Sequence, residues 1–174
     1  IGNWELGPYA ALGVGHKVAA IYRPLNNQLL SGLLKRRQAN YSGDIFRKGR
    51  EAALGMVSAL RKGQVMCLLV DQQLREGLPV PFFGHPAQTS ISHVKLAIRK
   101  KVPLMYMRTE RVGSSRFRIT ISPPIALPAE DDDATVIAVA TEINAEIERW
   151  IRAAPDQWFW PHRRWGKSCL LYTS

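Results

Sequence analysis

Three polar residues lie at positions where α/β proteins commonly have catalytic or ligand-binding side chains. Arg23 and Asp71 each follow an apolar run, and Glu5 follows Gly2-Asn3-Trp4. Ligands of open α/β sheets bind beyond the carboxyl ends of the strands, so we expect all three side chains to face one crevice. A guanidinium there offers a planar fork of donors to an oxyanion or a phosphate. Each residue also has a structural alternative, as a first-turn helix carboxylate or as an ion-pair partner.

A second candidate group lies near the end of the chain. His162, Arg163 and Arg164 follow the aromatic stretch Trp158–Trp160 and precede Trp165. Aromatic rings interleaved with cations are typical of segments that bind phosphorylated lipid headgroups at a membrane surface. The alternative is a solvated basic end of the domain.

Both groups need a sheet to position them, and the hydrophobic pattern predicts its strands. Lys17–Tyr22 and Gln64–Val70 are continuous apolar runs, as expected of buried strands that end at the polar residues. Two further strands are expected over Val102–Arg108 and Arg116–Ser122. The second of these alternates apolar and polar residues, which indicates a strand with one solvated face.

Helices are expected between the strands. Apolar spacings of three and four residues predict helices over residues 25–38, 49–63 and 90–101, and another from about Asp131 to before Pro155. Thr89 or Ser90 is the expected cap of the third helix, and Leu74–Ser90 is expected to be a loop because it is rich in Gly and Pro. The pattern indicates one α/β domain with a mixed, mostly parallel sheet flanked by helices.

Composition favours a single core with an anionic partner. The chain has 174 residues, and its 24 Lys and Arg against 14 Asp and Glu give a net charge of +10. This charge indicates nucleic acid, an acidic carrier protein or anionic lipid as partner. Cys67 and Cys169 are too few for a disulfide framework or a metal-binding cluster. No apolar run reaches the roughly 18 residues of a membrane-spanning helix.

Several motifs in a fixed order make the sequence resemble one family. The segments "GNWEL", "YRPLNN", "LLVDQQLREGLPVPFFGHPAQTS" and "APDQWFWPHRRW" are similar to those of the lipid A biosynthesis acyltransferases, which add secondary acyl chains to the lipopolysaccharide precursor of Gram-negative bacteria. The resemblance implies an acyltransferase domain over residues 1–165 with a glycerolipid-acyltransferase-like fold. Residues 166–174 are expected to be a non-native tail, because "CLLYTS" looks like the in-frame translation of a sequencing adapter.

The resemblance also implies a catalytic pair. The family signature is a histidine, four further residues and an acid, so Ile1–Trp4 would be the four residues, Glu5 the acid, and the histidine the residue before Ile1. Five residues of a straight helix rotate by about 500°, which leaves the two side chains about 140° apart. The pair can therefore meet only across a corner, with the histidine at a strand end and Glu5 on the first helical turn. The histidine would act as general base and Glu5 would hold its tautomer, so the chain without that histidine is expected to be inactive.

Further roles follow from the same resemblance. Arg23 and Asp71 belong to two other family blocks, and Arg23 is implied to lie near the thioester oxygen or an acceptor phosphate. The implied substrate-binding residues are Asn3, Trp4, His162, Arg163 and Arg164. The other histidines have no acid at the required spacing and are expected to be surface or packed residues: His16, His85 and His93.

The implied reaction moves a fatty acyl chain from acyl carrier protein to a hydroxyl of a lipid A precursor. It needs no cofactor or metal, because the carrier thioester supplies the acyl group. The expected partners are acyl carrier protein, the phosphorylated glycolipid and the cytoplasmic face of the bacterial inner membrane, with an anchor segment upstream of Ile1. One alternative is transfer to another glycolipid or to an aminolipid. The other is a basic nucleic-acid-binding module, although the sequence has no helix-turn-helix, RNA-recognition or zinc-finger motif.

Overall fold

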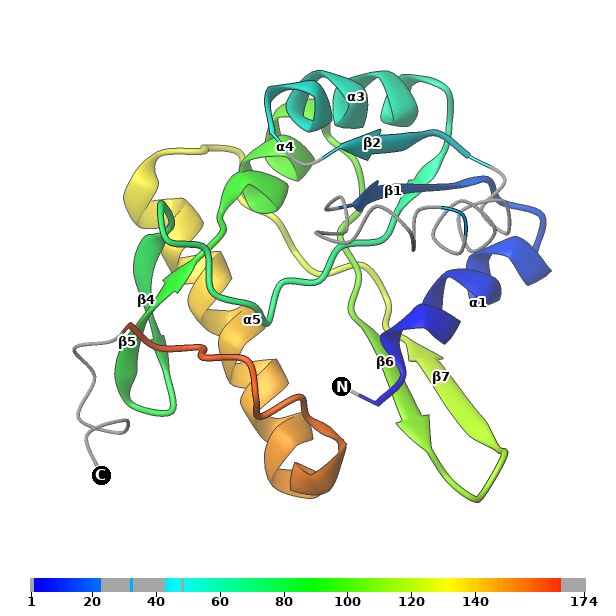
Figure 1. The fold of residues 1–174 in the computed structure, drawn as a ribbon. Coiled ribbons are helices and arrows are strands. Elements are labelled where there is room, and N and C mark those ends of the chain that lie inside the picture. Colours follow the sequence, from blue (N-terminus) through cyan, green and yellow to red (C-terminus); the bar gives the residue numbers. More distant parts are fainter. Residues whose placement is uncertain (1, 23–31, 33–42, 48, 167–174) are drawn as a thin grey trace. The chain divides into compact units, whose positions relative to one another are not determined.

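The structure is a computed structural model of the 174-residue chain and describes residues 2–22, 32, 43–47 and 49–166. The chain forms two compact units (Figure 1). The first unit comprises Glu5–Leu68, and the second comprises Ile1–Trp4 with Leu69–Ser174. The expected α/β class is confirmed. The described strands form one parallel sheet and two antiparallel pairs, so the sheets are smaller than expected.

The first unit is built on a parallel sheet in the order β2-β1-β3. Its strands are β1 (Val18–Tyr22), β2 (Ile45–Arg47) and β3 (Val65–Met66), and its helices are α1 (Gly7–Gly13), which follows the 3-10 helix η1 (Trp4–Leu6), and α3 (Arg50–Arg61). Val18 and Ala19 are fully buried in the central strand, as the apolar run predicts. The helix expected over residues 25–38 lies, apart from Gly32, outside the described residues.

The predicted strand Gln64–Val70 is longer than the observed one, because its apolar residues are divided between the two units. Val65 and Met66 pair with β1 in the first unit. Val70 instead packs against the hydrophobic core of the second unit. Asp71 therefore follows an irregular connection, and its predicted place at the end of a strand is wrong.

The second unit contains two hairpins and two helices. Its elements are β4 (Leu78–Phe82), β5 (His85–Thr89), α4 (Ser92–Lys100), β6 (Met107–Arg111), β7 (Phe117–Ile121), α5 (Asp133–Ala153) and the 3-10 helix η3 (Pro155–Gln157). The three predicted elements α4, β7 and α5 are confirmed. The strand expected over Val102–Arg108 begins only at Met107, and α4 has Ile91 at its N-cap with no side-chain hydrogen bond, so the predicted Thr89 or Ser90 cap is wrong.

The hairpin of β4 and β5 replaces the loop expected over Leu74–Ser90. Its two-residue turn, Phe83-Gly84, has φ values of 50° and 75°, which match the left-handed backbone of a type I′ turn. Prolines 79, 81 and 86 are exposed and hide the strand pattern in the sequence. The carbonyl of Pro81 accepts a hydrogen bond from Asn144 Nδ2 of α5 at 2.9 Å, so this hairpin is bonded directly to α5.

A single apolar core joins these elements of the second unit. Residues from the hairpin, α4, α5 and the C-terminal segment contribute to it: Phe82, Ala87, Val94, Ile98, Val136, Val139, Ile143, Ile147, Ile151, Trp158 and Trp165. The inward residues of α5 recur at the three- and four-residue spacing that predicted the helix.

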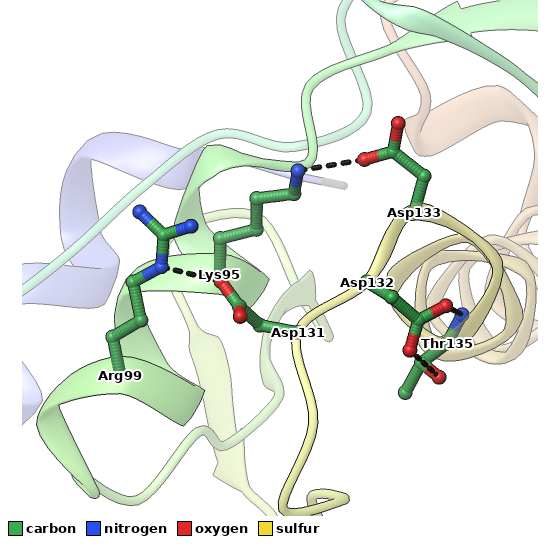
Figure 2. A network of polar contacts seen from close by, with 6 residues as sticks. All are labelled: Lys95, Arg99, Asp131, Asp132, Asp133 and Thr135. Atoms are coloured by element: carbon green, nitrogen blue, oxygen red, sulfur yellow. Dashed lines mark hydrogen bonds and ion pairs between the residues drawn. The ribbon is translucent and has the colours of Figure 1, made fainter.

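The acidic run at the start of α5 links that helix to α4. Asp132 caps α5 by accepting a hydrogen bond from the Thr135 backbone N–H at 3.0 Å. Two ion pairs reach the run from α4: Lys95–Asp133 at 2.7 Å and Arg99–Asp131 (Figure 2). The acids predicted to favour this helix N-terminus therefore provide one cap and two inter-helix contacts.

Candidate functional site

The N-terminal corner, Gly2–Glu5, begins with a glycine that the fold requires. Gly2 has a φ of +63°, and a Cβ there would lie 2.3 Å from the carbonyl oxygen of Thr109 in β6. Its backbone N–H donates to the carbonyl oxygen of Gln157 at 2.7 Å. Gly2 is therefore held between β6 and η3 at a distance that excludes any side chain.

Glu5 lies on the first helical turn, as the corner argument expects. It is half-buried in η1, which leads directly into α1. Asn3 is also half-buried, and the side chain of Trp4 lies outside the described part of the chain. Glu5 belongs to the first unit and Asn3 to the second, so their joint role stays a prediction.

An open cavity of about 590 Å³ adjoins the corner within the second unit. Its lining residues are Gly2, Asn3, Arg111, Gly113, Ser114, Asp156 and Gln157. The Arg111 guanidinium donates to the Ser114 carbonyl at 2.6 Å and lies 4.6 Å from the centre of the Phe117 ring. The cavity is therefore lined in part by an arginine whose orientation is fixed by its own hairpin.

Asp71 is half-buried and contacts the C-terminal segment. Its Oδ2 accepts a hydrogen bond from Trp158 Nε1 at 3.1 Å. Arg23 lies outside the described residues, and Glu5 belongs to the other unit. The common crevice for Glu5, Arg23 and Asp71 thus stays a prediction, while the bond to Trp158 is a contact that supports Asp71 as a structural partner.

Arg164 is the most deeply buried of the predicted basic residues. It is 0% exposed, and its guanidinium donates to the Gln88 carbonyl at 3.0 Å and to Thr89 Oγ1 at 2.7 Å. Burial lowers its pKa to about 10, and the negative charge of Asp71 opposes this change. Its described contacts are internal and hold β5.

The neighbours of Arg164 divide between internal and exposed positions. The backbone N–H of Gln73 donates to His162 Nε2 at 2.9 Å, so that nitrogen is the unprotonated acceptor of the ring. Trp165 Nε1 donates to the Phe82 carbonyl at 3.3 Å. Arg163 is exposed, as are Phe159 and Trp160. Of the three basic residues predicted to bind substrate, Arg163 is thus the most exposed.

Gln157 is a site residue that the sequence interpretation missed. Its side-chain Oε1 accepts from the Arg111 N–H at 2.8 Å, and its Nε2 donates to the Arg111 carbonyl at 3.2 Å. Its own carbonyl holds Gly2. The partners are backbone atoms of distant residues, so the only sequence signal was its place within "APDQWFWPHRRW".

The described residues lack two other kinds of structural feature. No three His, Cys, Asp or Glu side chains among them are grouped in a way that could hold a metal ion. In the same part of the chain, no helix has the length and apolar character needed to cross a membrane.

Comparison with known proteins gives one consistent family. The sequence model described as "Bacterial lipid A biosynthesis acyltransferase" matches residues 1–167. The chain is 30% identical over 165 residues to the lipid A biosynthesis palmitoleoyltransferase of Escherichia coli K12, which covers 92% of the chain and 51% of that protein. Its identity to the lauroyltransferase of the same organism is 29% over 164 residues, or 92% of the chain and 52% of that relative.

A lipid A biosynthesis acyltransferase of Shigella flexneri is likewise 30% identical over 165 residues. The chain spans about half the length of these curated relatives. The family match extends from the N-terminal corner through the C-terminal aromatic and basic segment. The chain belongs to the bacterial lipid A biosynthesis acyltransferase family.

Proposed function

We propose that the full-length protein transfers a fatty acyl chain from acyl carrier protein to a hydroxyl of a lipid A precursor. The observation that supports this most is the family match over residues 1–167, which includes the N-terminal corner. In the structure Glu5 lies in the short helix Trp4–Leu6. The names of the relatives specify palmitoleoyl and lauroyl transfer, so these two chains are the first donors to test.

In the proposed mechanism the residue before Ile1 is a histidine that acts as general base. It removes the proton of the acceptor hydroxyl while the oxygen attacks the thioester carbonyl, and the carrier thiolate leaves. The proton then passes to the thiolate, so the products are the ester and the free carrier thiol. Glu5 holds the histidine tautomer and stabilises the imidazolium, and Arg23 stabilises the thioester oxygen or binds an acceptor phosphate.

The proposed partners are both acidic, which suits a chain with a net charge of +10. Acyl carrier protein would supply the donor, and the phosphorylated glycolipid would be reached at the cytoplasmic face of the inner membrane. Arg163 and the neighbouring aromatic residues Phe159 and Trp160 are exposed, which supports a proposed role of this segment in headgroup binding.

The proposed mechanism is tested with the Glu5→Gln variant of the full-length enzyme. We expect acyl transfer to fall by about 10²- to 10⁴-fold, because an amide cannot neutralise the imidazolium. The assay follows transfer of laurate or palmitoleate from acyl carrier protein to a lipid A precursor by the mass of the product lipid. Glu130→Gln is the matched control, since Glu130 is exposed in a loop of the second unit. Near-normal turnover of Glu5→Gln would leave Glu5 with only a structural role.

A further inference from the structure

Gln157 connects three separate parts of the second unit at the edge of the cavity. Its side chain makes two hydrogen bonds to the backbone of Arg111, at 2.8 and 3.2 Å, as a neighbouring strand would. Its carbonyl oxygen accepts from the Gly2 N–H at 2.7 Å. The next residue, Trp158, is buried in the core. Gln157 is thus anchored to the core by its neighbour and to β6 by its amide.

The corner has little freedom to move against this anchor. Gly2 is in the left-handed backbone region, and its Cα approaches β6 so closely that a Cβ would lie 2.3 Å from the Thr109 oxygen. A shift of β6 toward Gly2 would therefore compress this contact, and a shift of η3 away from Gly2 would break the Gly2–Gln157 bond. The side-chain bonds between Gln157 and Arg111 oppose both shifts, because they fix η3 to the same strand.

We infer that Gln157 is a positioning residue for acyl transfer, which holds the backbone of Gly2, two residues after the proposed histidine. This inference rests on the proposed function. Gln157 acts through the Gly2 backbone, and the reacting atoms are handled by other residues. A reacting group displaced by about 1 Å can lower a rate by about 100-fold, so two modest hydrogen bonds can affect turnover far more than stability.

The test uses the full-length protein with Gln157→Ala and Gln157→Glu. For Gln157→Ala we expect kcat to fall by about 10- to 100-fold, with KM for acyl carrier protein and for the lipid A precursor little changed. Asp132→Ala is the matched control, because Asp132 also gives up two side-chain hydrogen bonds, at the distant start of α5. It should lower the melting temperature as much and leave kcat unchanged.

The glutamate variant gives a readout that a general loss of structure would not. Its ionised carboxylate can accept from the Arg111 N–H but faces the Arg111 carbonyl without a proton to donate. Protonation restores a donor, so the ratio of variant to wild-type kcat should rise as the pH falls from 8 to 5. The same ratio for Gln157→Ala should stay flat, since alanine has no proton to gain. A flat ratio for both variants would overturn the inference.

Hydrogen–deuterium exchange of the peptide that contains Gly2–Leu6 tests the geometry without any activity. Gln157→Ala should raise its exchange rate by about tenfold, as expected when a protecting bond opens more often, and Asp132→Ala should not. If the wild-type enzyme transfers no acyl chain, the proposed function fails, while unchanged exchange in Gln157→Ala would refute the positioning step itself. Faster exchange with unchanged kcat would also overturn the inference, because the corner would then move without affecting turnover.

Discussion

His93 should make the second unit lose stability in mild acid. Its side chain lies in α4 and is 8% exposed, and its Nε2 has no hydrogen-bond partner among the described residues. Burial lowers its pKa from 6.5 to about 4. Between these values the unfolded chain binds a proton that the folded chain does not, so the free energy of unfolding falls as the pH falls. Taking about 1.36 kcal/mol per pH unit over this gap gives a loss of about 3 kcal/mol between pH 6.5 and pH 4.

Denaturant unfolding followed by tryptophan fluorescence measures this loss, because Trp158 and Trp165 are buried in the core of the same unit. His93→Leu should remove most of the slope between pH 6.5 and pH 4, and at pH 8 it should be close to neutral, since an apolar side chain replaces an unpaired polar group. His85→Leu is the control, as His85 is exposed on β5. If His93→Leu keeps the wild-type slope, or His85→Leu loses it, the argument from burial is refuted.

Two further substitutions test the structural roles found in the second unit. Arg164→Ala should lower the free energy of unfolding by about 3 kcal/mol, because it removes the buried guanidinium that donates to Thr89 and opens a cavity, whereas Arg75→Ala at an exposed position of the same unit should change it by less than about 0.5 kcal/mol. Equal effects in denaturant titrations would contradict the assignment of Arg164 to the interior. Gly84→Ala should lower stability by about 1–2 kcal/mol, since φ is +75° in the hairpin turn and no atom lies within 4 Å of the added carbon. A loss much larger than this in the same titration would show that steric contacts, and not the backbone conformation, require a glycine at position 84.

The elements that the sequence predicted well are those whose apolar period matches one buried face. β1 is continuous and central, and α5 keeps a three- and four-residue spacing across the core, so both are confirmed. The hairpin of β4 and β5 was missed because exposed prolines alternate with its buried residues and resemble a loop. The strand predicted over Gln64–Val70 was too long, because an apolar residue does not specify the unit in which it packs. Val65 and Met66 pair with β1, whereas Val70 packs against the core of the second unit.

The C-terminal segment shows why interaction type was harder to predict than secondary structure. Its aromatic and basic composition indicates a lipid-facing cluster, yet several of its side chains bond to distant parts of the second unit: Gln157 to Arg111, Trp158 to Asp71, His162 to Gln73, Arg164 to Gln88 and Thr89, and Trp165 to Phe82. Most of these partners are backbone atoms, which any residue type supplies and which therefore leave no mark in a single sequence. The segment around Asp71 and the segment after Pro155 are bonded to each other, since Trp158 Nε1 donates to Asp71 and the Gln73 N–H donates to His162. Arg164→Glu should therefore destabilise the hairpin of β4 and β5, because it removes the guanidinium that donates to Gln88 and Thr89.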